Sequence, residues 1–205
     1  MLVISNRDIK KRGVSMKKLP VFRLLLAALI YLGLFVLASS CGLIHPACYA
    51  YAGTFVPILF SLLYLYTAST LRGFGAALLL NGFVLIVGLI MGEGNPPMII
   101  GLLLLALAAE LIRKLCGYET LRGVLLSFIP LAFSFYAYSA HWWTDTAGSL
   151  AAAGEEMPAG YADAMKPVID NIPMLIVMLL LTVPVAILGM RLAGKMMKKQ
   201  AAALQ

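Results

Sequence analysis

The chain has 205 residues, of which 62% are hydrophobic and 12% are charged, and its formal net charge is +7. A soluble domain is about half apolar and about a quarter charged, so this composition excludes an ordinary water-soluble domain and predicts an integral membrane protein. The basic balance does not predict a nucleic-acid-binding protein, because the sequence has no basic stripe with interleaved aromatic residues.

Six apolar runs are long enough to cross the roughly 30 Å hydrocarbon layer of a bilayer as helices. We predict an all-α bundle of six transmembrane helices, which forms one membrane domain over residues 20–199 after a basic segment, residues 1–19. The first run is too long for the apolar part of a cleaved signal peptide, so we expect it to be retained. The predicted spans are Val21–Ser40, Tyr49–Thr67, Gly73–Met91, Met98–Leu115, Leu121–Ser139 and Ile172–Leu192.

The Lys and Arg residues lie almost entirely on one side of this arrangement. With a cytoplasmic N-terminus, all of the 16 basic residues except Lys166 fall in cytoplasmic segments. Positive charges resist translocation, so this asymmetry predicts a multi-pass protein of the plasma membrane whose two termini are cytoplasmic, in contact with anionic lipid. The acidic residues gather on the outside. They either form an ordinary solvated surface or create a negative electrostatic field that favours cationic solutes. These outer acids are Glu93, Asp145, Glu155, Glu156, Asp163 and Asp170.

The segment CGLIHPAC, residues 41–48, joins the first two spans on the outside. Cys41 and Cys48 are either free thiols or a disulfide pair. Structural zinc takes four ligands, and the segment supplies too few, so we predict no metal site. His45 either begins a turn with Pro46 or hydrogen-bonds a solute at the mouth of the bundle.

The segment GEGNPP, residues 92–97, separates the third and fourth spans. Its glycines and prolines suit a turn that ends one helix and starts the next. A turn does not require Glu93, however, and an acid beside Asn95 between two buried helices also makes a compact polar site. Both interpretations are open from the sequence.

Few polar groups fall inside the predicted spans. Asn81 must face the bundle, either as an interhelical hydrogen bond or as a lining residue. Glu110 lies four residues before Lys114, which suits an ion pair along one helix. A coupled pump normally places acids or histidines at mid-depth, and the halves of the chain show no inverted repeat. We therefore expect a chain that does not energise transport by itself.

Residues 140–171 form one long outer segment, which is either a lid over a site or a disordered loop. The tryptophan pair in it either anchors the membrane interface or forms a wall that stacks on a ligand. No catalytic set emerges, because the sequence has no HExxH, no phosphate-binding glycine loop and no plausible Ser-His-Asp set, so we predict no enzyme. The aromatic and polar residues at the outer end of the fifth span and the start of this segment include Tyr136, His141, Trp142, Trp143 and Asp145.

Four stretches carry a resemblance to known membrane proteins: HPACYAYAGTFVPILFSLLYL, MGEGNPPM, AELIRKLCGYETLRG and GMRLAGKMMKK, spread over most of residues 20–199. The chain resembles the substrate-binding S components of energy-coupling factor (ECF) transporters, and is most similar to the Trep_Strep group of integral membrane proteins. The resemblance implies a six-span protein that binds a vitamin-like solute or a metal ion near the outer face. It also implies docking on a membrane scaffold subunit driven by two ATPase subunits.

The resemblance assigns roles to particular residues. The family's docking face corresponds to Ala27, Ala28 and Gly33 in the first span, where its Ala-xxx-Ala pattern is absent. Aromatic faces with carboxylates favour a flat cationic heterocycle such as a thiamine-related compound, and no cofactor is expected. The alternatives are a self-sufficient secondary transporter or channel, a membrane-embedded enzyme, and a structural subunit. The residues implied to bind the solute are His45, Glu93, Asn95, Tyr136, His141, Trp142, Trp143 and Asp145.

Overall fold

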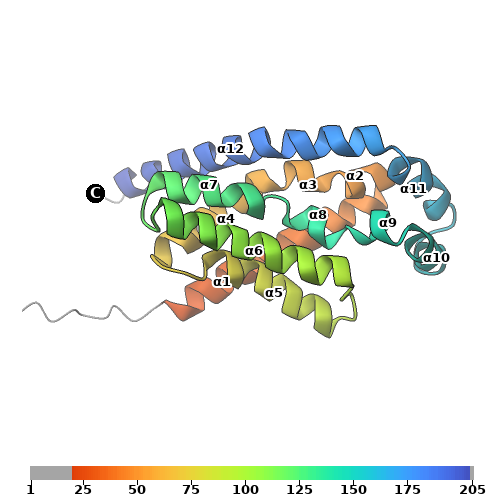
Figure 1. Ribbon diagram of the computed structural model, residues 1–205, viewed down its shortest axis with the longest axis horizontal. Helices are drawn as coiled ribbons and strands as arrows, with labels where there is room; N and C mark the ends of the chain where they lie inside the picture. Colours follow the sequence, from red (N-terminus) through yellow and green to blue (C-terminus); the bar gives the residue numbers. More distant parts are fainter. Residues whose placement is uncertain (1–19, 204–205) are drawn as a thin grey trace, which may run out of the picture.

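The computed structural model describes residues 20–203, and all regular structure in that range is helical. The predicted basic segment, residues 1–19, lies outside the described residues. The long helices run side by side along one axis, and α9, α10 and α11 gather at one end, the α9–α11 end (Figure 1). The elements are α1 (Val21–Ser40), η2 (Cys41–Leu43), α2 (Pro46–Ala50), α3 (Ala52–Phe55), α4 (Pro57–Thr70), α5 (Ala76–Ile90), α6 (Pro96–Cys116), α7 (Leu121–Leu131), α8 (Ser134–Tyr138), α9 (His141–Thr144), α10 (Thr146–Glu156), α11 (Tyr161–Ile169) and α12 (Ile172–Ala203).

Within residues 20–203, three helical stretches are long and apolar enough to cross a membrane, namely Val21–Leu43, Leu121–Tyr138 and Ile172–Met197. The helices α4 and α5 are also apolar but shorter. Large apolar side chains stand exposed on the outer faces, with Phe22 of α1 at 77% and Leu180 of α12 at 69%. Contiguous exposed apolar surface of this kind suits contact with lipid rather than water. The prediction of an all-helical, multi-pass membrane protein is therefore confirmed.

Two of the predicted spans are interrupted rather than single helices. The second is divided into α2, α3 and α4, because Tyr51 leaves the helical region (φ −109°, ψ 6°) and Pro57 starts a new helix at its first position. The fifth is divided into α7 and α8 just after Pro130, whose ring lacks a backbone N–H and clashes with the preceding turn. The expectation of one continuous helix in each of these spans was wrong.

The two interruptions pack against each other. A Cβ atom added to Gly53 of α3 would lie 2.6 Å from the ring of Tyr136 in α8, so only a glycine permits this approach. Beside it, the Thr54 and Tyr136 hydroxyls lie 2.6 Å apart, and Thr54 Oγ1 donates to the carbonyl of Met178 in α12 at 3.1 Å. Because the Thr54 proton goes to Met178, the Tyr136 hydroxyl donates to Thr54. One threonine thus joins α3, α8 and α12.

The end of the bundle opposite α9–α11 is fastened by a fully buried arginine. Arg113 of α6 has no exposed surface. Its Nη2 donates to the carbonyls of Ala68 and Leu71 at 2.7 Å each, and its Nη1 donates to the carbonyl of Gly73 at 3.1 Å. These carbonyls belong to the last turn of α4 and the loop after it. A positive charge there complements the negative end of the helix dipole.

Glu110, one turn earlier on α6, holds the start of the next helix. Its Oε1 accepts a 2.7 Å hydrogen bond from the backbone N–H of Ala77 in the first turn of α5, where the dipole favours negative charge. The predicted pair between Glu110 and Lys114 is therefore wrong. Among the described residues, the ion pair present is Lys166 with Asp170, at 3.0 Å.

Asn81 of α5 joins its helix to two others. Its Oδ1 accepts from the Tyr31 hydroxyl of α1 at 3.2 Å, and its Nδ2 donates to the Leu102 carbonyl of α6 at 3.1 Å. Asn81 is 1% exposed. Of the two alternatives left open by the sequence, the structure supports the interhelical hydrogen bond.

Candidate functional site

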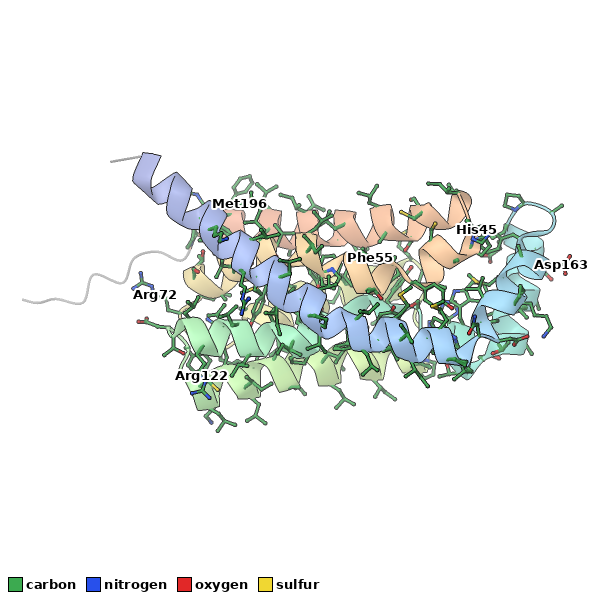
Figure 2. All side chains as sticks on the ribbon, turned by 90° about the horizontal axis from the view of Figure 1, so that it is seen from above. His45, Phe55, Arg72, Arg122, Asp163 and Met196 are labelled. Atoms are coloured by element: carbon green, nitrogen blue, oxygen red, sulfur yellow. The ribbon has the colours of Figure 1, made fainter. Side chains whose placement is uncertain are left out.

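A cavity of about 600 Å³ lies at the α9–α11 end, which we call the polar cavity. Its walls come from the α5–α6 turn, from α8 to α11, and from α2 and the end of α1. The labelled side chains in Figure 2 place His45 and Asp163 at this end of the molecule and Arg72 and Arg122 at the other. The polar cavity thus lies at the end that the charge pattern predicts to be outside.

Sequence positions far apart meet in the polar cavity. The turn between α5 and α6 approaches the segment that begins at α9, and both approach α2 and α11. The predicted site residues that line the cavity are Glu93, Asn95, His141, Trp142 and Asp145. The predicted residues His45, Tyr136 and Trp143 do not line it.

The three residues outside the cavity have other contacts. The His45 Nδ1 accepts from the Ala47 N–H at 3.1 Å, so His45 caps the short helix α2. Tyr136 is 7% exposed and bound to Thr54, as described above. Trp143 packs against the cluster formed by α2, α9, α10 and α11.

The GEGNPP segment is a turn and also presents a carboxylate. Gly92 adopts a left-handed backbone angle (φ +83°), which suits glycine. Asn95 accepts from the Met98 N–H at 2.9 Å and caps α6, which Pro96 begins. The side chain of Glu93 takes no part in this turn and makes no hydrogen bond to the described residues, so its carboxylate is available at the cavity wall.

The polar cavity carries negative charge. Glu93, Asp145 and Glu156 line it, and no Lys or Arg is among its described lining residues. The Asp145 Oδ1 accepts from the Gly148 N–H at 3.2 Å, which fixes this carboxylate at the start of α10. Three carboxylates with no basic partner raise the local concentration of cations and favour a positively charged ligand.

Aromatic rings form much of the remaining wall. Tyr49 and Trp142 meet edge to face, with ring centroids 6.2 Å apart, and Tyr138 and Tyr161 complete the aromatic lining. Trp142 is 5% exposed, and its indole Nε1 is buried without a hydrogen-bond partner among the described residues. The aromatic wall therefore consists of one indole ring and three phenol rings, which come from α2, α8, α9 and α11.

Tyr49, Tyr138 and Tyr161 were missed by the sequence-based assignment. The sequence offers Tyr136 and Tyr138, which are two residues apart and therefore point to nearly opposite sides of a helix, so the choice between them depends on which side of the helix faces the cavity. The interruption after Pro130 changes which side that is, so Tyr138 reaches the cavity and Tyr136 points to Thr54.

A serine and a histidine meet in the polar cavity, although the sequence showed no plausible Ser-His-Asp set. The His141 Nδ1 lies 2.8 Å from the Ser149 Oγ, which also donates to the His141 carbonyl at 3.1 Å. With its proton on the carbonyl, the serine accepts from the imidazole, so His141 is not placed to activate Ser149 as a base. Burial lowers the pKa of His141, and nearby Asp145 opposes that effect. These bonds close the corner between α9 and α10.

The cysteines and the predicted docking residues lie outside the polar cavity. Cys41 and Cys48 are free thiols. Within residues 20–203, no group of three His, Cys, Asp or Glu side chains is placed to hold a metal ion. Ala27 and Ala28 are buried within the bundle, whereas Gly33 is exposed and has open space above it.

A comparison with protein families agrees with the membrane fold. No curated protein and no solved structure matches this chain. The family model described as a hypothetical bacterial integral membrane protein (Trep_Strep) matches residues 21–202, which include all of the helices that form the polar cavity. The chain therefore belongs to the Trep_Strep family of bacterial integral membrane proteins.

Proposed function

We propose that this protein is the substrate-binding S component of an ECF-type importer. It binds a small cationic solute, such as a thiamine-related heterocycle, in the polar cavity. The observation that carries the proposal is the lining of this cavity: Glu93, Asp145 and Glu156 are present without Lys or Arg among the described lining residues. A cation there gains from the carboxylates and from the faces of the aromatic rings.

The proposal includes six membrane crossings with both termini cytoplasmic in the plasma membrane. The shorter helices α4 and α5 and the 21-residue α6 then complete the set begun by the three longer stretches. The separation of Arg72 and Arg122 from Asp163 along the long axis supports this orientation (Figure 2). The polar cavity then faces outward.

The proposal also assigns the energy for transport to a partner, an ECF scaffold subunit with two ATPases. Glu110 and Arg113, the ionisable side chains buried in α6, are both bound to backbone groups of other helices. Neither is free to carry a proton across the membrane, which supports a chain that needs an external source of energy.

A binding titration tests the proposal. Both tryptophans of the chain lie in α9 beside the polar cavity, so their fluorescence reports on this site. With the purified chain in lipid nanodiscs, thiamine should change the fluorescence saturably, and Glu93→Gln should weaken binding at least about tenfold. Glu155→Gln is the matched control, because it removes the same charge from an exposed side chain that does not line the cavity.

The outcomes separate the alternatives. Equal effects of Glu93→Gln and Glu155→Gln would contradict the assigned site. In proteoliposomes, uptake should require the ECF module and ATP, and uptake by the chain alone would favour a self-sufficient transporter. Chemical conversion of the bound compound that stops with Ser149→Ala would favour a membrane-embedded enzyme.

A further inference from the structure

A second cavity of about 390 Å³ lies next to the polar cavity, between α1 and α5, and we call it the apolar cavity. Its walls include Leu32, Phe35, Val84 and Val87. Three of its lining side chains are more than half exposed, so it is a groove open to the molecular surface rather than a void sealed in the interior. An apolar groove that adjoins a polar cavity is a candidate binding compartment.

The two cavities adjoin each other at one shared wall. The residues that line both are Ser39, Met91, Glu93, Tyr138 and Met157. The free carboxylate of Glu93 thus stands where the polar compartment meets the apolar one. A ligand whose positive group lies at Glu93 has carboxylates and aromatic rings on one side and aliphatic side chains on the other.

We propose that the ligand is an amphiphilic cation, whose charged head occupies the polar cavity and whose apolar arm occupies the apolar cavity. This inference rests on the proposed function and specifies its substrate class. The shared position of Glu93 favours one ligand over two independent ones, because a cationic head held at this carboxylate already borders the apolar cavity that would receive its arm.

The rim of the apolar cavity also gives the arm a route. Val36 is 59% exposed, Leu43 is 72% exposed and Met91 is 73% exposed, and all three line the cavity. This rim lies on the side of α1 and α5, where the surface is apolar and suits lipid. An amphiphile that rests at the membrane surface can therefore slide its arm in from the bilayer while its head reaches Glu93 from the water side.

A pair of probes tests the inference with the full chain in nanodiscs. Tetramethylammonium supplies the head alone, and hexyltrimethylammonium adds an arm of five methylenes. Burial of apolar surface contributes about fourfold in affinity per methylene, so the hexyl probe should bind roughly a hundredfold more tightly even if the arm is only partly buried. Tryptophan fluorescence gives both dissociation constants, and their ratio is the readout.

Variants distinguish binding of the arm in the apolar cavity from partition of the whole probe into the lipid bilayer. Val87→Phe fills the apolar cavity, and the affinity ratio should fall at least tenfold. Ile86→Phe is the matched control on the same helix, since Ile86 is 58% exposed and does not line the cavity. Its ratio should stay at the wild-type value. Val36→Phe fills the cavity from α1 and serves as a second test if Val87→Phe does not fold.

Each outcome has a definite meaning. If tetramethylammonium binds and Glu93→Gln abolishes binding, but the ratio is the same in all variants, the arm does not enter the apolar cavity and the inference is overturned. A lipid chain that fills the cavity permanently would give that same result. If thiamine and both probes fail to bind, the proposed function fails and this inference fails with it.

Discussion

Arg113 offers the sharpest test of what holds the bundle together. We predict that Arg113→Ala destabilises the protein severely, because the guanidinium is fully buried and donates short hydrogen bonds to the end of α4. The substitution leaves those carbonyls without a donor in a site closed to water. It also removes the positive charge from the side of α6 that carries the buried Glu110.

The magnitude follows from the contacts. Each buried hydrogen bond from a charged donor contributes roughly 1.5–3 kcal/mol, so losing the two shortest bonds of Arg113, those to Ala68 and Leu71, costs about 3–6 kcal/mol. For a chain of this size, each kcal/mol corresponds to about 2–4 °C in melting temperature. The melting temperature of Arg113→Ala should therefore fall by about 10 °C. Arg113→Lys keeps the charge but not the planar set of donors, so its loss should be intermediate.

The assay is thermal unfolding of the purified protein followed by circular dichroism. The matched control is Lys114→Ala, which removes the same charge from the next residue of the same helix, where the side chain is exposed. That variant should melt within about 2 °C of the wild type. A similar value for Arg113→Ala would refute the assigned role of the buried arginine.

Two further predictions concern other parts of the fold. Burial lowers the pKa of His141 below 6.5, so the imidazole takes up a proton more readily in the unfolded than in the folded state, and the melting temperature of α9–α10, followed by tryptophan fluorescence, should fall below about pH 6.5. His141→Asn should remove this fall in melting temperature, and a fall that persists in the variant would exclude His141 as its source. Gly53→Ala places a Cβ against the Tyr136 ring and should cost about 1–3 kcal/mol of stability, whereas the Cβ of Gly33→Ala meets nothing within 4 Å and should not lower the melting temperature. Equal melting temperatures of the two variants would argue against the close approach of α3 and α8.

Local patterns predicted the first and last spans well. The run predicted as Val21–Ser40 has the same bounds as α1, and the last span begins at Ile172, as α12 does. Both begin as long apolar runs, and only α12 has a proline in its interior, at Pro184. Apolar length alone determines such helices, so no knowledge of their neighbours is needed.

The candidate site was predicted only in part, for a different physical reason. Glu93, His141 and Asp145 were recognised because polar groups at the ends of spans stand out. Tyr49 and Tyr138 were missed because a tyrosine at a helix end is equally common as an interface anchor. Which of them faces a cavity depends on tertiary packing and on the breaks in the second and fifth spans.

The buried contacts of α6 were likewise beyond local reasoning. An i, i+4 pair between Glu110 and Lys114 is favourable on an isolated helix. In the bundle, the ends of α4 and α5 offer Glu110 and Arg113 backbone partners 33 to 45 residues away. Hydrogen bonds to these backbone groups are favoured over the pair with Lys114, because unpaired backbone groups in an apolar medium are costly, whereas Lys114 can stay exposed.

The contact of Thr54 with α12 has a consequence for biogenesis. Thr54 donates to Met178, which lies 124 residues further along the chain. An interrupted span leaves backbone groups that lipid cannot satisfy, so the region around α3 needs protein cover at that depth. During synthesis the second span therefore leaves the translocon before the helix that covers it exists. The contact between Thr54 and Met178 forms only after α12 has been made, so α3 reaches its final conformation late in synthesis.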